Sequence, residues 1–218
     1  MSWFVASNYD RWMRPAEAAC LVEWRADLVR GLTGDVLEVG AGTGAMLSHY
    51  PLTISRLVLA EPDRHMRRRL AAKCRRMVLP TFELSDATIE WLPLPDASLD
   101  AVVSALVLCS VPSEHTALAE ILRVLRPGGR LFFLEHVVAD RLSSRFAWQR
   151  RLEPAWRFFA GNCHLTRDTE HAIGAAGFHV DQIRRESMRK AMPFMRPSIR
   201  GTARKPVSSL MEGRHATR

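Results

Sequence analysis

The sequence Asp35-Val-Leu-Glu-Val-Gly-Ala-Gly-Thr-Gly44 is the most informative part of this 218-residue chain. Its first five residues are largely apolar and predict a short buried strand from Asp35 to Val39. Glycines then alternate with small side chains, so the backbone is able to turn sharply and a ligand is able to lie against it. Residues 45–50 predict a helix whose first N–H groups face the turn. We therefore expect a nucleotide-type binding turn here.

Two kinds of ligand suit such a turn. The pattern Gly40-x-Gly42-x-x-Ala45 satisfies the dinucleotide fingerprint. However, Glu38 stands two residues before the first glycine, and its carboxylate would repel an anionic pyrophosphate. S-adenosylmethionine has no phosphate, and its sulfonium and ammonium groups suit a nearby carboxylate. The sequence therefore favours S-adenosylmethionine, with a dinucleotide or a turn without a ligand as the alternatives.

Apolar strands alternate with amphipathic helices along the rest of the chain. We expect strands at 56–60, 77–84, 101–108 and 130–134, helices at 66–76, 114–125 and 168–177, and a final pair of edge strands at 178–186 and 199–203. The continuously apolar run 101–108 indicates burial on both faces, as in a parallel sheet. This order of elements predicts an α/β fold, an open parallel sheet with helices on both faces.

Ligands of such sheets bind beyond the carboxyl ends of the strands. Glu61 follows the second strand, about 20 residues after the glycine turn, where an acid suits the two hydroxyls of a ribose. The fourth strand ends in Ser104-Ala105-Leu106, which we expect to lie under the cofactor, and the fifth ends in Glu135-His136. The N-terminal helix, expected to end near Arg30, would cover this edge and bring Tyr9 to the methionine part of the cofactor.

The composition indicates one cytoplasmic domain, at residues 1–204, followed by a flexible basic tail at 205–218. No stretch approaches the roughly 18 uninterrupted apolar residues of a membrane-spanning helix, and the first ten residues lack the pattern of a secretory signal. The cysteines are widely spaced and form no Cys-x-x-Cys pair, so we expect neither a metal site nor a disulfide framework. Residues 141–165 read as an aromatic-rich, lid-like insertion that shapes an apolar pocket.

The net charge of +8 is concentrated at residues 64–76 and 184–218. Such clusters attract nucleic acid or anionic lipid. No aromatic-rich nucleic-acid motif accompanies them, so we do not expect a nucleic-acid partner and interpret them as a solvated helix face and a tail. Peripheral contact with an anionic membrane remains an alternative.

From Val36 to about Lys205 the chain resembles class I S-adenosylmethionine-dependent methyltransferases. The matching motifs are Leu37-Glu-Val-Gly-Ala-Gly-Thr-Gly44, Pro95-Asp-Ala-Ser-Leu-Asp100 and Leu125-Arg-Pro-Gly-Gly-Arg-Leu131. A closer resemblance is to methyltransferase-like alkyl thiol S-methyltransferases. It is carried by Leu106-Val-Leu-Cys-Ser-Val111, Glu135-His-Val137, Trp148-Gln149, Leu152-Glu-Pro-Ala-Trp156, Cys163-His-Leu-Thr-Arg167 and Arg196-Pro-Ser-Ile-Arg-Gly201. The chain departs from this family in lacking a long apolar N-terminal anchor and in having Asn162 and His164 where the family has a glycine and an amide.

The resemblance implies a Rossmann-like, doubly wound seven-stranded sheet, mostly parallel with an antiparallel last strand. It implies that the chain binds S-adenosylmethionine through residues of the N-terminal helix, the turn and the strand ends: Tyr9, Glu38, Gly40, Ala41, Gly42, Gly44, Glu61, Pro62, Thr88, Ile89, Ser104, Ala105 and Leu106. The adenine contact falls on Thr88 and Ile89 when Leu92-Pro93 is aligned without gaps, or on Asp86 after a two-residue shift.

The reaction implied is methyl transfer to a small, hydrophobic acceptor, with a thiol favoured over a lipid amine or a quinone. A thiol reacts as its thiolate, so a neighbouring imidazole would assist. His136 is the first candidate for this catalytic role and His164 the second. An NAD-linked oxidoreductase and a non-catalytic nucleic-acid or membrane binder are the alternatives from other classes.

Overall fold

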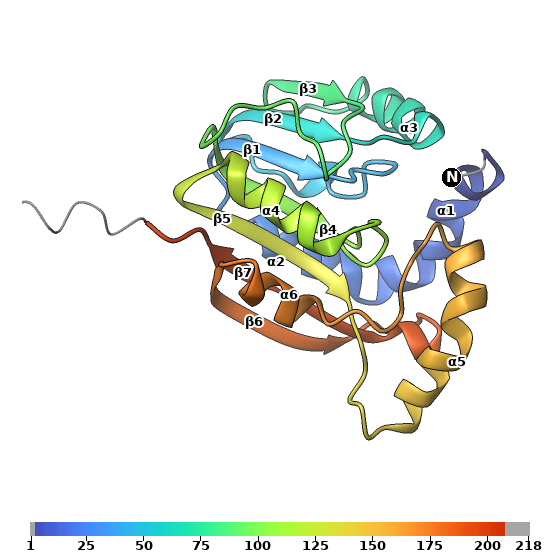
Figure 1. The fold of residues 1–218 in the computed structure, drawn as a ribbon. Coiled ribbons are helices and arrows are strands. Elements are labelled where there is room, and N and C mark those ends of the chain that lie inside the picture. Colours follow the sequence, from blue (N-terminus) through green and yellow to red (C-terminus); the bar gives the residue numbers. More distant parts are fainter. Residues whose placement is uncertain (1–2, 208–218) are drawn as a thin grey trace, which may run out of the picture.

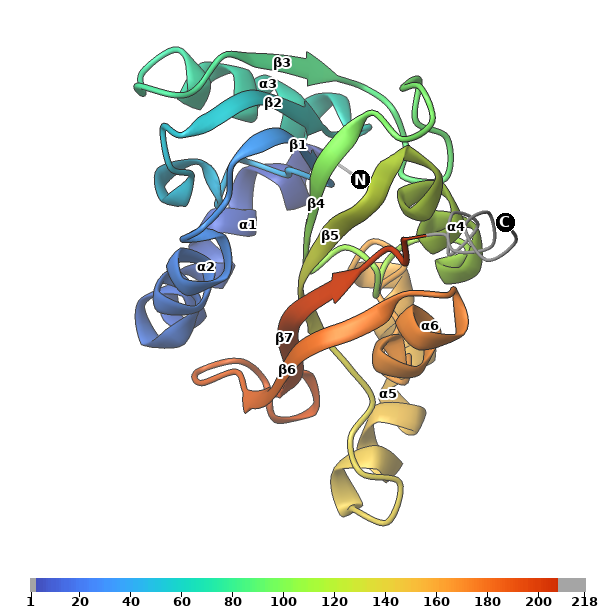
Figure 2. The same ribbon diagram turned by 90° about the vertical axis from the view of Figure 1, so that its left-hand side faces the viewer.

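A seven-stranded sheet in the order β3-β2-β1-β4-β5-β7-β6 runs through residues 3–207, the part of the chain that this computed structural model describes (Figures 1 and 2). The strands are β1 (Gly34–Val39), β2 (Ile54–Ala60), β3 (Phe82–Ser85), β4 (Leu99–Ala105), β5 (Leu125–His136), β6 (His179–Ser187) and β7 (Pro197–Arg204). β7 pairs antiparallel with both β5 and β6, and the pairs from β3 to β5 are parallel. The predicted mostly parallel sheet with an antiparallel last strand is confirmed.

Helices cover both faces of this sheet (Figures 1 and 2). The α-helices are α1 (Trp3–Ala16), α2 (Val22–Val29), α3 (Arg64–Cys74), α4 (Glu114–Val124), α5 (Ser144–Phe159) and α6 (Thr169–Ala175). A π-helical turn, η1 (Glu17–Leu21), joins α1 to α2, and the 3₁₀ turns are η2 (Leu47–His49) and η3 (Pro193–Met195). Ser113 caps the start of α4, where its side chain accepts a hydrogen bond from Thr116 N.

The apolar core has two layers because the strands bury both faces. Alternate residues of each strand point to opposite sides of the sheet. Val36 and Val103 therefore pack in the layer that includes Trp24 of α2, whereas Leu37 and Val102 pack in the layer that includes Leu118 of α4. This arrangement explains why the central strands read as continuous apolar runs.

Several elements differ from the prediction. β5 spans Leu125–His136 rather than 130–134, and three further elements differ for a local reason. The helix expected at 45–50 is only the turn η2, because Tyr50 precedes a proline and takes an extended conformation. The third strand begins at Phe82 rather than residue 77, since Pro80 cannot donate to a ladder. The fourth strand ends at Ala105, where Leu106 turns the chain out of the sheet with φ +63°.

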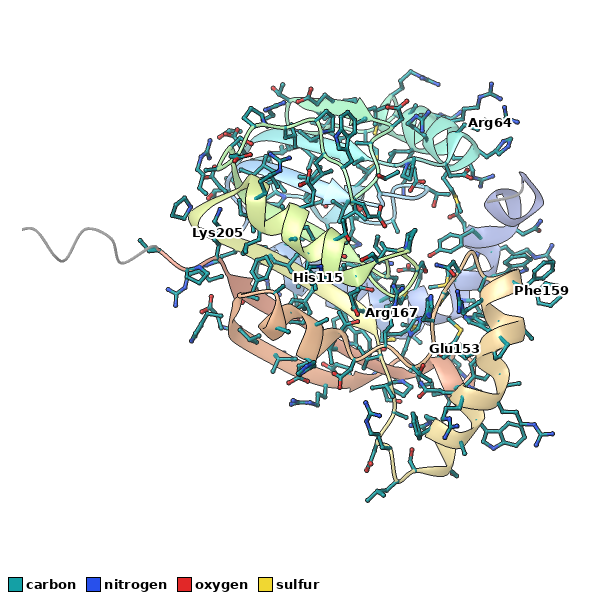
Figure 3. All side chains as sticks on the ribbon, in the orientation of Figure 1. Arg64, His115, Glu153, Phe159, Arg167 and Lys205 are labelled. Carbon is teal, nitrogen blue, oxygen red and sulfur yellow. The ribbon has the colours of Figure 1, made fainter. Side chains whose placement is uncertain are left out.

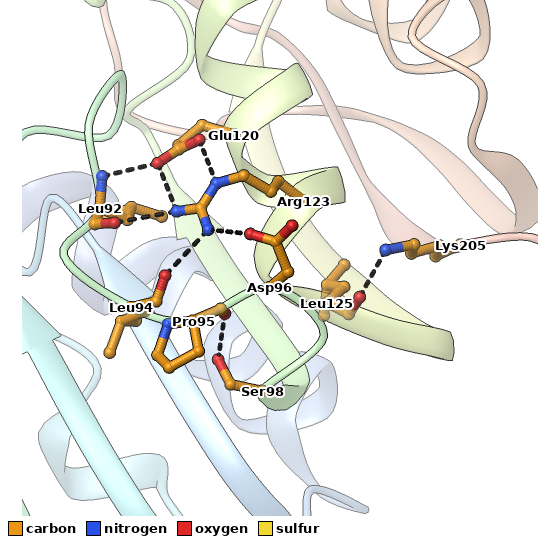
Figure 4. Close-up of polar contacts among 9 residues, drawn as sticks. All are labelled: Leu92, Leu94, Pro95, Asp96, Ser98, Glu120, Arg123, Leu125 and Lys205. Atoms are coloured by element: carbon orange, nitrogen blue, oxygen red, sulfur yellow. Dashed lines mark hydrogen bonds and ion pairs between the residues drawn. The ribbon is translucent and has the colours of Figure 1, made fainter.

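The C-terminal boundaries also differ. β7 lies between β5 and β6, so of the predicted pair of edge strands only β6 is at an edge of the sheet. Lys205, the first residue of the predicted tail, is tied to β5: its N–H donates to Gly129 O at 2.9 Å and its Nζ to Leu125 O at 2.7 Å (Figure 4). Residues 208–218 lie outside the described part. Within residues 3–207, none of the helices combines the length and apolar character needed to cross a bilayer.

Candidate active site

The glycine turn follows β1, and its three glycines have different functions. All take a positive φ: +58° at Gly40, +57° at Gly42 and +82° at Gly44. A Cβ added at Gly40 would lie 2.6 Å from Val107 Cγ2, and one at Gly44 would lie 2.7 Å from Leu47 Cδ1. At Gly42 the nearest atom would be 3.9 Å away. Gly40 and Gly44 are therefore required by packing, whereas the open space at Gly42 leaves the backbone accessible to a ligand.

Glu61 lies against this turn, as the sequence predicts for a ribose-binding acid. Its Oε2 accepts a hydrogen bond from Gly42 N, and its Oε1 accepts one from Asp63 N, each at 2.8 Å. Burial raises the pKa of Glu61 above its ordinary value. The neighbouring Pro62 is exposed at the end of β2. The open glycine backbone and the acid beside it fit the S-adenosylmethionine cofactor that the sequence predicts.

Glu38 lies beneath the turn rather than at its mouth. It is 2% exposed, and the Tyr50 hydroxyl donates to its Oε2 at 2.9 Å. Burial raises the pKa of Glu38 to about 7. The reason for this placement is the alternation of β1, which turns position 38 to the same side as Val36 and α2. In this structure Glu38 is therefore buried against Tyr50, and a direct contact with the cofactor remains a prediction.

The region expected to hold the adenine contains a groove of about 660 Å³ between α3 and the end of β3. Asp86 and Ser85 line it, together with arginines of α3, whereas Thr88 is exposed outside its lining and Ile89 is buried in the core. Asp86 therefore lies at the groove, and which of the two alternatives contacts the adenine remains a prediction. Arg123 of α4 holds the following loop by donating to the carbonyls of Leu92 and Leu94 (Figure 4).

Three cations of the basic cluster on α3 contact other parts of the molecule. Arg67 donates to the carbonyl of Glu61 at 2.6 Å, and Lys73 donates to that of Gly44 at 2.5 Å. Arg69 forms an ion pair with Asp10 of α1 at 3.2 Å. We call the glycine turn and Glu61 the cofactor half of the site. These side chains hold its loops in place, which is consistent with the structural interpretation of the charge.

The ends of β4 and β5 are joined by a buried carboxylate. Glu135 Oε1 accepts hydrogen bonds from Ser104 Oγ at 2.7 Å, Val107 N at 3.1 Å and Leu108 N at 3.2 Å. Ser104 is fully buried, so its side chain supports the loop that follows β4 instead of lying open to a ligand. Ala105 and Leu106 are partly exposed at this edge and remain candidates for cofactor contact.

Three buried side chains meet where β4 and β5 end. His136 Nε2 lies 2.7 Å from Cys163 Sγ, and Cys163 Sγ lies 3.9 Å from Cys109 Sγ. His136 is 2% exposed. The Cys109 thiol beside it, together with burial, raises the pKa of Cys163. We call Cys109, His136 and Cys163 the Cys-His-Cys cluster. Sequence reasoning missed the two cysteines, because their spacing matches no metal or redox motif.

His164 does not join this cluster through its ring. Its Nδ1 lies 3.6 Å from Glu153 Oε1, and burial lowers its pKa. Its backbone N–H donates to Cys109 O at 2.8 Å, so the residue contributes through its main chain. Arg167 donates to the carbonyls of Leu108 and Val111 and holds the loop that carries Cys109. In Figure 3, Arg167 and Glu153 lie toward α5, at the other end of the sheet from Lys205.

The N-terminal helix α1 interacts with both the Cys-His-Cys cluster and the glycine turn. Tyr9 is partly buried, its pKa is raised to about 12 mainly by burial, and it interacts electrostatically with both thiols of the Cys-His-Cys cluster. The next residue, Asp10, accepts a hydrogen bond from Thr43 Oγ1 of the glycine turn at 2.5 Å. Asp10 was missed by sequence reasoning, since nothing local distinguishes it from a surface acid.

The predicted lid contains α5, which leads directly to Cys163. Gln149 is fully buried and fixes the helix by donating to the carbonyls of Val137 and Phe194 at 3.1 and 2.9 Å. Phe158 and Phe159 on its last turn are 83% and 71% exposed. The helix thus presents aromatic side chains outside the core, and its function as a lid remains a prediction.

Comparison with known proteins identifies relatives over most of the chain. A family model described as a methyltransferase domain matches residues 37–133. The thiol S-methyltransferases TMT1B and TMT1A of Homo sapiens are 39% and 35% identical, over 72% and 77% of this chain and 67% and 69% of their own lengths. The chain thus spans about two thirds of these relatives. A solved S-adenosylmethionine-dependent methyltransferase of Thermotoga maritima, 21% identical, superimposes with a TM-score of 0.66 over 93% of this chain and 97% of that one, which shows a shared fold.

Proposed function

Because the chain belongs to the S-adenosylmethionine-dependent methyltransferases, in the family that includes the thiol S-methyltransferases, we propose that it methylates the sulfur of a small, hydrophobic thiol. The observation that carries the proposal is the Cys-His-Cys cluster, which lies at the strand ends beside the cofactor half of the site. A buried group of two thiols and an imidazole suits an acceptor that reacts through sulfur.

The cofactor half binds and positions S-adenosylmethionine. Its open backbone at Gly42 receives the cofactor, and the carboxylate of Glu61 is placed to accept hydrogen bonds from the ribose hydroxyls. When bound, the cofactor supplies an electrophilic methyl group on a sulfonium sulfur. The protein then contributes proximity and alignment of the acceptor with that methyl group.

We call the Cys-His-Cys cluster, with Tyr9 and the end of α5, the acceptor half of the site. It must hold the thiol and remove its proton. A free thiol has a pKa near 8.5, so only a small fraction is thiolate at neutral pH. We place the acceptor sulfur at the Cys-His-Cys cluster, and we assign to His136 the role of assisting removal of the thiol proton. Tyr9 covers this position from α1 and helps to exclude water. The aromatic end of α5 provides the apolar surface that a hydrophobic acceptor requires.

Calorimetric titration with S-adenosylhomocysteine, with NADH as the control, tests the cofactor half. We expect micromolar binding of the first and no binding of the second. Methyl transfer is then measured by mass spectrometry with isotope-labelled S-adenosylmethionine and matched acceptors: an aromatic thiol, a lipid amine and a demethylated quinone. A labelled thioether as the main product supports the proposal, whereas exclusive methylation of the amine or the quinone contradicts the choice of thiol.

A further inference from the structure

The two sulfur atoms of the Cys-His-Cys cluster have the separation of zinc ligands. Cys109, His136 and Cys163 each offer one possible ligand atom, and these three atoms all lie within 4.8 Å of one another. In a tetrahedral zinc site with Zn–S bonds near 2.3 Å, two sulfur atoms lie about 3.8 Å apart. The two sulfur atoms here are 3.9 Å apart.

The contact between His136 and Cys163 is short for a hydrogen bond to sulfur. It measures 2.7 Å, whereas Cys20 Sγ lies 3.5 Å from Ala16 O and Cys109 Sγ lies 3.5 Å from Ser110 Oγ. Zinc bonds of ordinary length would place a ligand nitrogen and sulfur about 3.5 Å apart. A shift of about 0.8 Å in one side chain, derived from those bond lengths, would therefore admit the ion.

Hydrogen bonds fix the backbone around each of the three side chains. His136 ends β5 and is paired in register with Ser198 of β7. The chain beside Cys109 is held through the N–H of Leu108, which donates to Glu135, and the chain beside Cys163 through Asn162 Nδ2, which donates to Ser110 O at 3.1 Å. Ligands whose backbone is fixed in this way form a preorganised site.

The types of donor in this cluster indicate which ion it suits. Two thiolates and an imidazole, with no carboxylate among the three, are a donor set that selects zinc over magnesium or calcium.

We propose that Cys109, His136 and Cys163 bind one Zn²⁺ ion, whose fourth coordination position receives the acceptor thiol. Three protein ligands and one exchangeable position are the arrangement of catalytic zinc sites. This inference rests on the proposed function for the identity of the acceptor. On binding, the S–H bond of the acceptor breaks, a Zn–S bond replaces a zinc-bound water, and the proton leaves to solvent. The sulfur keeps its electron pair for the methyl carbon, and no oxidant is required because zinc is redox-inert.

Metal content and spectroscopy test the site without relying on turnover. The full chain is dialysed against chelator under reducing conditions, titrated with Zn²⁺, and its metal counted by mass spectrometry. Co²⁺ is then used as a coloured substitute, because thiolate ligands give it a charge-transfer absorption. We expect one ion per chain in the wild type and in Cys74→Ser, which alters a buried cysteine elsewhere. In Cys109→Ser and Cys163→Ser we expect binding weakened at least 100-fold and loss of the thiolate band.

The fourth position is tested by adding an aromatic thiol to the Co²⁺-loaded protein. A shift of the charge-transfer band that saturates with the thiol supports coordination of the acceptor. Failure of the folded wild type to bind Zn²⁺ stoichiometrically, or equal binding by Cys163→Ser, would overturn the metal site. Recovery of a Cys109–Cys163 disulfide in place of metal would do the same.

Separate outcomes address the proposed function. Full thiol methylation by metal-free protein would overturn the metal inference and leave the methyltransferase proposal intact. A stoichiometric zinc site in a protein that does not methylate thiols would support the metal site and contradict the choice of acceptor.

Discussion

Gly42 and Glu61 lie 19 residues apart in the sequence and meet at the ends of adjacent parallel strands. Cys109, in the loop after β4, and Cys163, which follows α5, lie 54 residues apart in the sequence. We assign the first pair to the cofactor half of the site and propose the second as part of the acceptor half. A cofactor shared by many enzymes is bound by a local motif that is recognisable in one sequence. The acceptor half is assembled from distant segments, so its chemistry becomes visible only in the fold.

The largest effect expected to separate the two halves comes from His136→Asn. We expect turnover to fall by about 100-fold or more, the scale for removing a group that assists proton removal from a nucleophile, with S-adenosylhomocysteine affinity largely kept. Steady-state kinetics and calorimetry measure the two quantities. His115→Asn, at an exposed site on α4, is the control. Intact turnover in His136→Asn would remove this residue from the reaction.

The opposite pattern is expected from Glu61→Ala, which should change the cofactor half and leave the acceptor half unchanged. Loss of a charge-assisted hydrogen bond to the cofactor should weaken its binding by about 1–3 kcal/mol, and the metal content of the acceptor half should not change. Calorimetry with S-adenosylhomocysteine checks this result. Glu83→Ala, which removes an exposed ion pair with Arg56, is the matched control and should leave cofactor affinity unaltered. Equal affinity of the two variants would contradict a role for Glu61 in binding.

A smaller effect sharpens the description of the cofactor half. Gly42→Ala places a side chain at φ +57°, which costs about 1–2 kcal/mol of stability, and fills the space open to the ligand. We expect cofactor affinity to fall about tenfold beyond the change in stability. Thermal unfolding and calorimetry separate these contributions, with Gly31→Ala as the control at an open site. Unchanged affinity would show that the cofactor does not approach Gly42.

The smallest expected effect concerns Glu38, whose pKa is raised to about 7 by burial. Because the folded state keeps this proton longer than the unfolded state, the free energy of unfolding should fall as pH rises from about 4.5 to 7, by about 1 kcal/mol between pH 6 and 7. Arg25, Lys73, Glu61 and the hydrogen bond from Tyr50 also influence this group. Glu38→Gln should reduce this slope in denaturant titrations at several pH values. An unaltered slope would show that another group causes the pH dependence of the free energy of unfolding.

The sequence predicted most of the sheet because its signals were local. Continuous apolar runs identified β1, β2 and β4, and the helix expected from residue 114 begins there as α4. The errors at 45–50 and 77–81 arose where a proline overrode the apolar pattern. Local propensity is a weak guide at such positions, since one missing N–H ends the element.

The prediction of the site was less complete, and for a different reason. Glu61 followed from its distance to the glycine turn, and its position against Gly42 agrees with that reasoning. The burial of Glu38 and the pairing of His164 with Glu153 depend on which face each residue turns to its neighbours, which one sequence does not reveal. The partnership of Cys109 with Cys163 required the path of α5, whose end brings the second thiol back to the sheet.

The position of α1 couples the two parts of the site. Tyr9 and Asp10 are adjacent in one helix, yet the first interacts electrostatically with both thiols of the Cys-His-Cys cluster and the second accepts a hydrogen bond from Thr43 of the glycine turn. A displacement of this helix would therefore change the glycine turn and the cluster at the same time.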